Sequence, residues 1–526
     1  MKTIIKRIPW FYILFTIYPL LFLWATNITE IDPSVVIRPF LVTLLGSAIL
    51  YAILYISFRN IDRAALIGTL ILIIFFSYGH LYYKTRTVPA LEILSHHHTL
   101  IPIYLVLFAL GVWGIFRLKK YTGTARFMNV VGLVLVGLQV FQLGYSYTRA
   151  AFAARRPVTL QSGLTVPANR STLPDVYFIV LDTYMRSDAL QQEMGFDNTP
   201  FLKQLDKLGF YVAHCSRPNY AYTKGSIASI LNMNFLPDLE ATTHLSTNDD
   251  GFWTVINHNE VARQLKSIGY KTIAFQNEYP RLEVTDADVF LGLGRPSINS
   301  HYLYPFEDLY LRSTAAVIFT AADSKLNISR LFQALSPSQD PNANIPANLD
   351  PFLRYHIDLQ YFTLEKLTEI PAIPGPKFVY AHIMIPHGPY VFGPNGEIVA
   401  DPNYIGDDSA SAADSAEARQ GYVYGVQFID GKIIPVLQDI ISKSKNPPII
   451  ILQGDHGYRD KSQGKYTILN AYYLPGGYSN LYPSITPVNS FRMILDDYFG
   501  ANYPLLPDIT SGDVPVVPET YSDCLP

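Results

Sequence analysis

The sequence predicts an N-terminal α-helical membrane module of five transmembrane helices, followed by an α/β domain with a mostly parallel central sheet between helices. Two observations predict this division. Five long runs with almost no charged residue lie before residue 148. Beyond residue 174, short apolar runs rich in β-branched and aromatic residues alternate with segments of helical spacing. The expected parts are residues 1–148 for the membrane module, 149–173 for a polar linker and 174–526 for the globular domain.

The composition fits a membrane-bound chain and excludes some classes of partner. Of 526 residues only 16% are charged, and the net charge is −3. No strongly basic surface argues for nucleic acid. The two cysteines, Cys215 and Cys524, form neither a Cys-x-x-Cys pair nor a zinc framework. A disulfide between them would require an oxidising compartment. We expect two separate thiols, with Cys215 serving in packing.

The five apolar runs each approach the roughly 20 residues that a membrane span needs. They cover residues 9–26, 39–58, 64–83, 99–116 and 127–147. No small-residue cleavage site follows the first run, which predicts a retained anchor. Basic residues gather before the first run and in alternate loops, so five spans would place the globular domain outside the cytoplasm. The scarcity of ionisable groups within the runs favours an anchor over a transport path.

The globular domain places chemically active side chains at the ends of its predicted strands. The strands are expected at residues 176–181, 272–275, 378–385 and 449–452, and two of the helices at 199–208 and 423–441. Ligands of parallel sheets bind beyond the carboxyl ends of the strands. Asp182, His387, Asp455 and His456 all follow such an end. We therefore expect residues that are distant in the chain to converge on one edge of the sheet.

Each of these residues also has a purely structural interpretation. Asp182 is suited to capping the next helix, and Thr223 to capping a helix that begins near Lys224. Asp455 with the two residues after it has the composition of a turn, and His387 between two prolines that of a loop. The ordered set, with every member in the right strand or helix context, favours a functional site.

The residue types indicate a metal-dependent reaction at phosphorus. Asp182, Thr223, Asp455 and His456 together offer nitrogen and oxygen ligands, which suit one divalent metal, Zn²⁺ or Mn²⁺. A metal-bound Thr223 oxygen would be an activated nucleophile. Three further side chains are candidates for binding the substrate, and two of them also for protonating the leaving group. They are His382 and His387 for both roles, and Arg459 for neutralising charge.

Over about residues 174–508 the motifs resemble the alkaline phosphatase superfamily, specifically its sulfatase-like branch. Thr223, Ser226 and Ser229 fall in register with a pattern of the type C/T-x-x-S-x-x-S-L-L at the start of a helix. The later motif S/G-D-H-G matches at Asp455 and His456. An H-x-x-x-x-H-x-P-Y segment begins at residue 382, and residues 422–430 match the helix pattern Y-x-x-x-x-x-x-x-D.

Two departures from the sulfatase pattern point to one group within that branch. Sulfatases use a cysteine or serine that is converted to formylglycine, where this chain has Thr223, and they place a second aspartate where it has Thr183. The chain in this respect is similar to membrane-anchored lipoteichoic acid synthases and phosphoethanolamine transferases. In the transferases the first metal ligand is usually glutamate, where this chain has Asp182. Residues 232–370 match no pattern of the branch.

This resemblance implies an integral membrane enzyme of the cell (inner or plasma) membrane with an extracytoplasmic catalytic domain. Its expected donor is a membrane phospholipid, and its acceptor a surface glycan or lipid. A phosphoethanolamine or phosphoglycerol head group would pass through Thr223. One alternative is a sulfatase-like hydrolase of phosphate or sulfate esters. The other is a catalytically silent membrane protein that acts in surface-polymer assembly.

Overall fold

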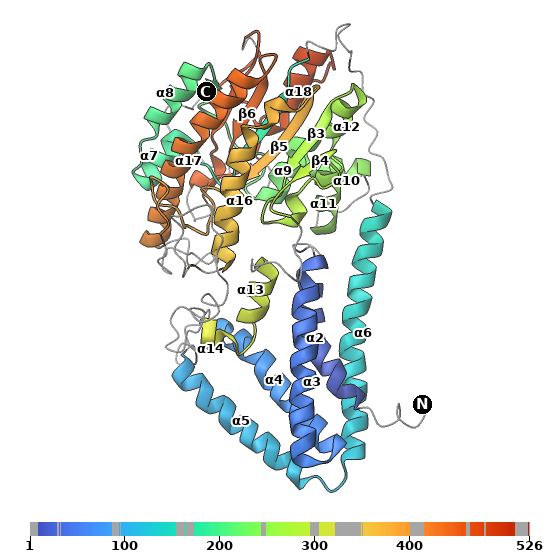
Figure 1. Cartoon of the computed structure of the whole chain (residues 1–526). Coiled ribbons are helices and arrows are strands. Elements are labelled where there is room, and N and C mark those ends of the chain that lie inside the picture. The colour runs from blue at the N-terminus through green and yellow to red at the C-terminus, as the bar shows by residue number, and fades with distance from the viewer. Residues whose placement is uncertain are drawn as a thin grey trace. The chain divides into compact units, whose positions relative to one another are not determined.

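The computed structural model describes most of both expected parts (Figure 1). The described residues are 9–28, 31, 33–86, 94, 96–153, 164, 173–243, 249–294, 304–320, 349, 351–399, 415–458, 463–477, 480–510 and 524.

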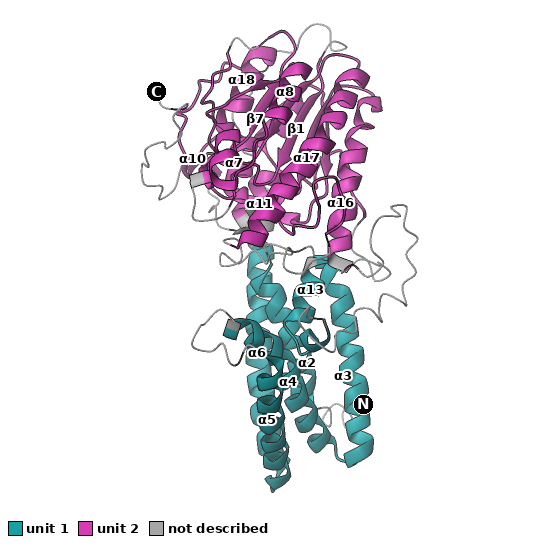
Figure 2. Ribbon diagram, turned by 90° about the vertical axis from the view of Figure 1, so that its left-hand side faces the viewer, with its two compact units in different colours: residues 1–148, 295–340, 350–352 teal, residues 149–294, 341–349, 353–526 magenta. Residues whose placement is uncertain are grey.

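The chain divides into two compact units, which we call the helical unit and the globular unit (Figure 2). The helical unit comprises residues 1–148, 295–340 and 350–352, and the globular unit comprises residues 149–294, 341–349 and 353–526. The predicted fold class, apolar N-terminal helices followed by an α/β domain, is confirmed. The helical unit also includes residues 295–340. The expected boundaries of 1–148, 149–173 and 174–526 assign this later segment to the globular domain.

The helical unit contains five long helices from the N-terminal part of the chain. They are α2 (Trp10–Thr26), α3 (Ile37–Phe58), α4 (Ile61–Arg86), α5 (His97–Arg117) and α6 (Tyr121–Ala153). Among the described residues, four stretches are long and apolar enough to cross a membrane, and they correspond to α3, α4, α5 and α6. The helix α2 is apolar but has only 17 residues, so the count of five spans stays a prediction.

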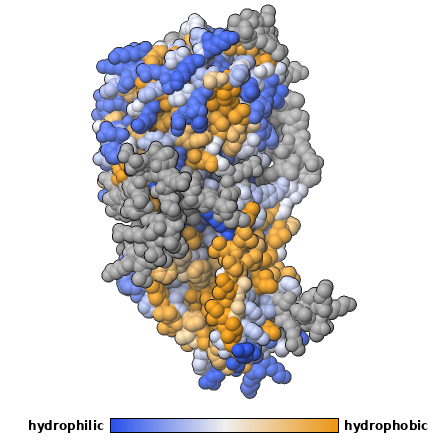
Figure 3. Space-filling view, in the orientation of Figure 1, coloured by the Kyte–Doolittle hydropathy of each residue, from blue (hydrophilic) through white to orange (hydrophobic). Residues whose placement is uncertain are grey.

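The outward surface of the helical unit is apolar, as a lipid-facing surface must be. The helix α4 packs against α2, α3 and α5, and 56% of its apolar 18-residue stretch is buried. In contrast, only 6% and 11% of the corresponding stretches of α3 and α5 are buried. Hydrophobic side chains therefore dominate the surface of these helices (Figure 3).

A short segment from the middle of the sequence docks onto these helices. It forms α13 (Pro305–Arg312) and α14 (Val317–Thr320). Arg38, at the start of α3, makes a bidentate ion pair with Glu307, with Nε 2.6 Å from Oε1. Tyr310 shares a hydrogen bond of 2.6 Å with Thr43, and Val317 is buried among tyrosines of α4 and α5. We call residues 304–320 the docked segment.

A glycine allows the docked segment to approach α4 closely. A Cβ atom at Gly79 would lie 2.1 Å from the carbonyl oxygen of Arg312, which no side chain tolerates. The amide of Ala315 donates to the carbonyl of Phe75 at 2.7 Å, one helical turn before Gly79. Backbone contact of this kind fixes the position of the docked segment along α4.

The globular unit is built on a seven-stranded sheet in the order β2-β7-β6-β1-β5-β3-β4. The strands are β1 (Val176–Leu181), β2 (Tyr211–Val212), β3 (Lys271–Phe275), β4 (Val289–Leu291), β5 (Lys377–Ile383), β6 (Ile449–Gln453) and β7 (Asn470–Tyr473). The central strands β6, β1, β5, β3 and β4 are parallel, and β7 is antiparallel to β6 and β2. The prediction of a mostly parallel sheet is confirmed, with an antiparallel edge added to it.

Helices cover both faces of the sheet, which explains why its central strands are apolar throughout. All six residues of β1 are buried. One face carries α7 (Ser187–Met194), α8 (Thr199–Leu208), α16 (Pro351–Leu367) and α17 (Ala416–Lys443), as Figure 1 shows. The other carries α9 (Thr223–Asn232), α10 (Leu236–Thr243), α11 (Asp249–Asn257), α12 (Glu260–Ser267) and α18 (Pro487–Phe499).

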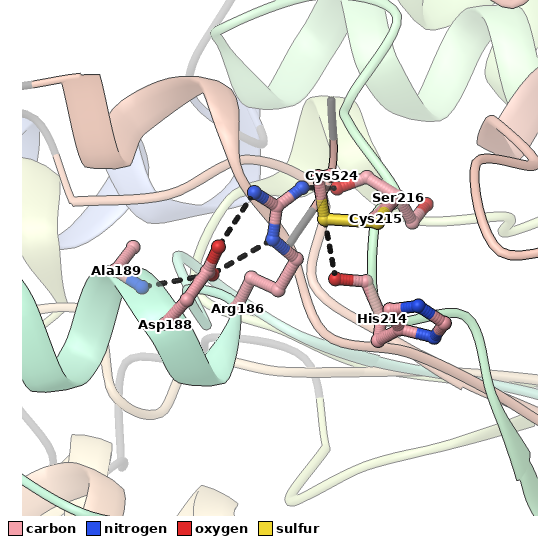
Figure 4. Close-up of a disulfide and its surroundings, with 7 residues drawn as sticks. All are labelled: Arg186, Asp188, Ala189, His214, Cys215, Ser216 and Cys524. Carbon is pink, nitrogen blue, oxygen red and sulfur yellow. Dashed lines mark hydrogen bonds and ion pairs between the residues drawn. A yellow bond between two sulfur atoms is a disulfide. The ribbon is translucent and has the colours of Figure 1, made fainter. Parts of the chain in front are cut away.

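The two cysteines form a disulfide, which corrects the expectation of separate thiols (Figure 4). Cys215 lies shortly before α9, and Cys524 lies 309 residues later in the sequence. The expectation was wrong because nothing local in the sequence shows that the C-terminus returns to this loop. Next to the disulfide, the buried Arg186 pairs with Asp188 and donates to the carbonyl of Ser216 at 3.1 Å. The disulfide therefore ties Cys524 to a loop that is already held by the hydrogen bond from Arg186 to Ser216.

We expect Cys215→Ser to lower the stability of the globular unit by about 2–5 kcal/mol, because it frees a long loop in the unfolded chain. Thermal unfolding with and without reductant measures this, and Cys524→Ser should have the same effect. Peptide mapping without reduction should recover the linked pair from the wild-type protein. Equal thermal unfolding midpoints for the oxidised, reduced and mutant proteins would contradict the prediction.

Candidate metal centre and nucleophile

The candidate site lies at the carboxyl edge of the three central strands β6, β1 and β5. Asp182 directly follows β1, Asp455 and His456 follow β6, and His382 is the last residue but one of β5. The register places His382 beside Val180, and the amide of Asp182 donates to the carbonyl of Ile383 at 2.9 Å. Neighbouring parallel strands therefore bring these residues together, as their sequence positions predict.

Thr223 is the first residue of α9 and faces this edge. Its hydroxyl oxygen lies 3.1 Å from Nε2 of His456, and only 8% of the residue is exposed. Ser226, one turn later, donates its hydroxyl to the carbonyl of Asp455 at 2.6 Å. The cap position belongs to Tyr222, and no side-chain cap bond forms there. Thr223 is thus not a helix cap, and its hydroxyl is directed at the site.

The hydrogen bonds of His456 define which of its ring nitrogens faces Thr223 as an acceptor. Nδ1 lies 2.7 Å from the carbonyl oxygen of Gly457, and since a carbonyl only accepts, Nδ1 carries the hydrogen. In its neutral form the ring directs the lone pair of Nε2 at the Thr223 hydroxyl. The same lone pair is the one that a metal ion would use.

Asp182, His382 and Asp455 form a group in which ligand atoms lie within 4.8 Å of one another, a spacing suited to a metal ion. Nε2 of His382 donates to Oδ2 of Asp182 at 3.0 Å, and the amide of Thr183 donates to Oδ1 of Asp455 at 3.0 Å. The second oxygen of each carboxylate is buried without a hydrogen bond in this structure. Buried carboxylate oxygens without donors are costly unless a cation satisfies them. The residues therefore fit a divalent metal.

His382 lies against the two carboxylates, which the sequence does not predict. It was expected to contact the substrate, whereas the structure places it against the first carboxylate, Asp182. Its ring is held from the other side by the Tyr380 hydroxyl, 3.3 Å from Nδ1. Asp182 itself does not cap α7, which begins at Ser187 after Arg186. The capping alternative for Asp182 is therefore not observed.

Three imidazoles set the charge state of the first carboxylate. Burial alone would raise the pKa of Asp182, but His387, His382 and His456 together outweigh it and hold that pKa well below its usual range. Asp182 is thus ionised at neutral pH and ready to bind a cation. His387 also lies on this side of the sheet, in the loop after β5, where Nδ1 donates to the carbonyl of Gly388 at 2.6 Å. Arg459 lies outside the described residues.

Thr183 also contributes to the site, although nothing about a threonine at this position predicts that role. Thr183 adopts a left-handed backbone conformation, φ 63°, which is rare for a β-branched residue. This conformation directs its amide at Asp455. Tyr422 of α17 holds the turn, because its hydroxyl donates to the carbonyl of Thr183 at 2.8 Å and accepts from the amide of Met185 at 3.1 Å. The Y-x-x-x-x-x-x-x-D pattern at residues 422–430 is the sequence feature that indicates this support.

The other end of that pattern, Asp430, leads to a prediction about pH. The hydroxyl of Tyr184 donates to Oδ1 of Asp430 at 2.6 Å, and burial raises the pKa of that carboxyl well above its usual range. The folded state therefore holds this proton more tightly than the unfolded state. Its stabilising effect is complete below the unfolded pKa and is lost as pH rises through the folded pKa.

We expect Asp430→Asn to raise the unfolding temperature at neutral and alkaline pH and to change little in acid. An asparagine oxygen still accepts from Tyr184 but carries no buried charge. Each 1 kcal/mol gained corresponds to roughly 2–4 °C for a unit of this size. Thermal unfolding from about pH 3, below the unfolded pKa, to about pH 9 provides the measurement. If the unfolding temperatures of the two proteins changed with pH in the same way, Asp430 would not titrate as inferred.

Comparison with known proteins finds similarity among solved structures. No family model matches the sequence, and no curated protein matches it. Lipooligosaccharide phosphoethanolamine transferase A from Neisseria meningitidis, an integral membrane protein, is 12% identical, with 93% of this chain and 94% of that chain covered and a TM-score of 0.38. The zinc complex of the periplasmic domain of EcEptC from Escherichia coli is 12% identical, with coverages of 67% and 91% and a TM-score of 0.38. A 2-O GAG sulfatase is also 12% identical, with coverages of 63% and 71% and a TM-score of 0.37. Phosphoethanolamine transferases and sulfatases are the enzyme classes that the sequence motifs resemble.

Proposed function

We propose that this protein is a membrane-anchored, metal-dependent phosphotransferase that moves a phospholipid head group to a cell-surface glycan or lipid through Thr223. The observation that carries the proposal is the contact between the Thr223 hydroxyl and His456, beside two buried carboxylates with unsatisfied oxygens. A nucleophile, a set of metal ligands and the start of a helix meet at one point. The apolar helices would hold this site at the surface where a lipid donor lies.

In this proposal Asp182, Thr223, Asp455 and His456 would hold one divalent cation, Zn²⁺ or Mn²⁺, with His382 against Asp182. When bound, such an ion lowers the pKa of a coordinated hydroxyl and stabilises negative charge at phosphorus. Since His382 donates to one oxygen of Asp182, it orients the carboxylate and leaves the other oxygen for the cation.

The chain's own residues account for the transfer steps. The Thr223 hydroxyl gives its proton to water, its oxygen attacks the phosphorus of the donor phosphodiester, and the bond to the diacylglycerol oxygen breaks. His387, with Nδ1 held by Gly388, would in its protonated form give the Nε2 proton to that leaving oxygen. The N–H groups of the first turn of α9 favour the negative phosphoryl group beside Thr223. In the second half, an acceptor hydroxyl gives its proton to His387 as its oxygen displaces Thr223 from the same phosphorus, and Thr223 takes a proton back from water.

The globular unit is proposed to lie on the extracytoplasmic face of the cell membrane. The alternation of basic residues supports this orientation, and so does the disulfide. Disulfides persist in oxidising compartments and are rare in the cytosol. The lipid head groups of the outer leaflet would then be within reach of the site.

The test uses purified full-length protein in detergent with fluorescent phosphatidylethanolamine or phosphatidylglycerol and added Mn²⁺ or Zn²⁺. We expect metal-dependent release of fluorescent diacylglycerol, which a chelator stops, and the lipid that reacts identifies the donor. Activity only on soluble phosphate or sulfate esters would favour the hydrolase alternative. A purified protein that binds neither metal would favour the catalytically silent alternative.

A further inference from the structure

A buried polar network joins α16 to the loops that follow β3 and β5. Glu278, just beyond β3, pairs with Nδ1 of His356 and accepts from Nε2 of Gln360 at 3.1 Å. His356 and Gln360 stand four residues apart, so they share one face of α16. All three side chains are almost completely buried, at 7%, 0% and 2% exposure in the order named.

The network ends on the backbone of the loop that carries His387. Oε1 of Gln360 accepts from the amide of Met384 at 2.9 Å, directly after the last residue of β5. The strand β5 itself ends at Ile383, where its partner β1 ends, and not at residue 385 as predicted. From the neighbouring loop, the ring of Tyr279, next to Glu278, packs edge-on against the ring of His387 at 6.3 Å.

The opposite side of the same loop lies against α17. A Cβ atom at Gly421 would come within 2.6 Å of the Tyr390 side chain, and one at Gly425 within 3.2 Å of Pro386. Glycines at these positions let the loop rest directly on the helix. The loop of residues 384–390 is therefore held by the hydrogen bond from Met384 to Gln360 of α16 and by close packing on α17.

We propose that Gln360 and Glu278 are positioning residues that hold the His387 loop in place for the transfer reaction. The proposal rests on the proposed function for the role of His387, but the contacts themselves do not depend on it. A buried glutamate–histidine pair contributes little net stability compared with apolar side chains of similar volume. Its value here lies in joining the loop after β3 to the loop after β5, the strand that carries His382 at the site. A displacement of the loop would move His387 away from the phosphoryl group.

The decisive variant is Gln360→Met, which keeps the volume and removes both hydrogen bonds. Its matched control is Thr363→Val on the same helix, since Thr363 is also buried but bonds only within α16, to the carbonyl of Leu359 at 3.0 Å. In the full-length, metal-loaded protein we expect Gln360→Met to lower kcat about 10–100-fold, as outer-shell positioning groups do. The KM and the metal content should change much less, and Thr363→Val should stay close to the wild type.

A second pair of variants separates geometry from folding. Glu278→Gln keeps an oxygen that accepts from Gln360, whereas Glu278→Leu does not. We expect Glu278→Gln to retain most of the kcat that Glu278→Leu loses. Equal losses in Gln360→Met and Thr363→Val, or no rescue by Glu278→Gln, would overturn the positioning role.

Amide hydrogen exchange tests the same proposal without any activity. Peptides that contain Met384 should exchange faster in Gln360→Met than in the wild type and in Thr363→Val, because the amide loses its acceptor. If the wild type transfers no head group, the proposed function fails, and this measurement still decides the positioning role. Unchanged exchange at Met384 in Gln360→Met would overturn it.

Discussion

Thr223→Ala should reduce head-group transfer by about 10³-fold or more, because it removes the atom to which the phosphoryl group becomes attached. Thr223 is almost buried, and its hydroxyl has the Nε2 atom of His456 as partner. An alanine leaves that nitrogen with its lone pair and opens only a small space. The fold should therefore persist, and the loss should appear in kcat rather than in expression or stability. The measurement is diacylglycerol release from the donor lipid under saturating metal.

The covalent intermediate gives this prediction an independent readout. Protein incubated with donor lipid and no acceptor should gain the mass of one phospho-head group on the peptide that contains Thr223. Thr223→Ser keeps a hydroxyl and should form the adduct at a reduced rate, and Thr223→Ala should form none. If Thr223→Ala retained transfer, or if the mass appeared on another peptide, Thr223 would not be the nucleophile.

Asp455→Asn should lower metal affinity by more than about 100-fold, beyond the 10–100-fold loss typical of outer-shell groups. One oxygen of Asp455 accepts from the amide of Thr183, and asparagine can keep that bond. The other oxygen is buried without a hydrogen bond, so a neutral side chain is better tolerated there in the absence of metal. We therefore expect the metal-free variant to be at least as stable as the metal-free wild type, yet inactive.

Thermal unfolding with increasing Zn²⁺ or Mn²⁺ tests this prediction. A metal at a hundred times its dissociation constant stabilises the wild type by about 2.7 kcal/mol, and the variant should show almost none of this gain. His387→Ala is the matched control, since His387 faces the site but is not among the proposed ligands. A normal metal-induced shift in Asp455→Asn would remove Asp455 from the ligand set.

Local patterns were enough to predict the central strands and the residues at their ends. The apolar run before Asp182 is β1, the run before Asp455 is β6, and parallel pairing then brings the two carboxylates together. The position of Thr223 at the start of a helix follows from the same kind of local pattern. Such features depend on periodicity and on the direction of strands, both of which a sequence displays.

The features that the sequence did not reveal depend on contacts between distant residues. Cys215 and Cys524 are joined across 309 positions, and Arg38 pairs with Glu307, which lies 269 residues away. The left-handed turn at Thr183 is stabilised by Tyr422 rather than by its own residue type. His382 approaches Asp182 only because β5 and β1 pair in one particular register. None of these has a local signature.

Because the docked segment packs on helices from the start of the chain, two fragments of this chain should bind each other. A single cut between residues 154 and 172 would give one fragment with α2–α6 and another with everything after them. The second fragment would still carry α13 and α14, which pack on α4 beside Gly79 and pair Glu307 with Arg38. Severing the connection would therefore not release the globular unit from the bilayer. Conversely, a version that began at the cut would expose Val317 to water and leave Glu307 without its ion pair to Arg38, so the earlier helices are needed to bury this later part of the chain.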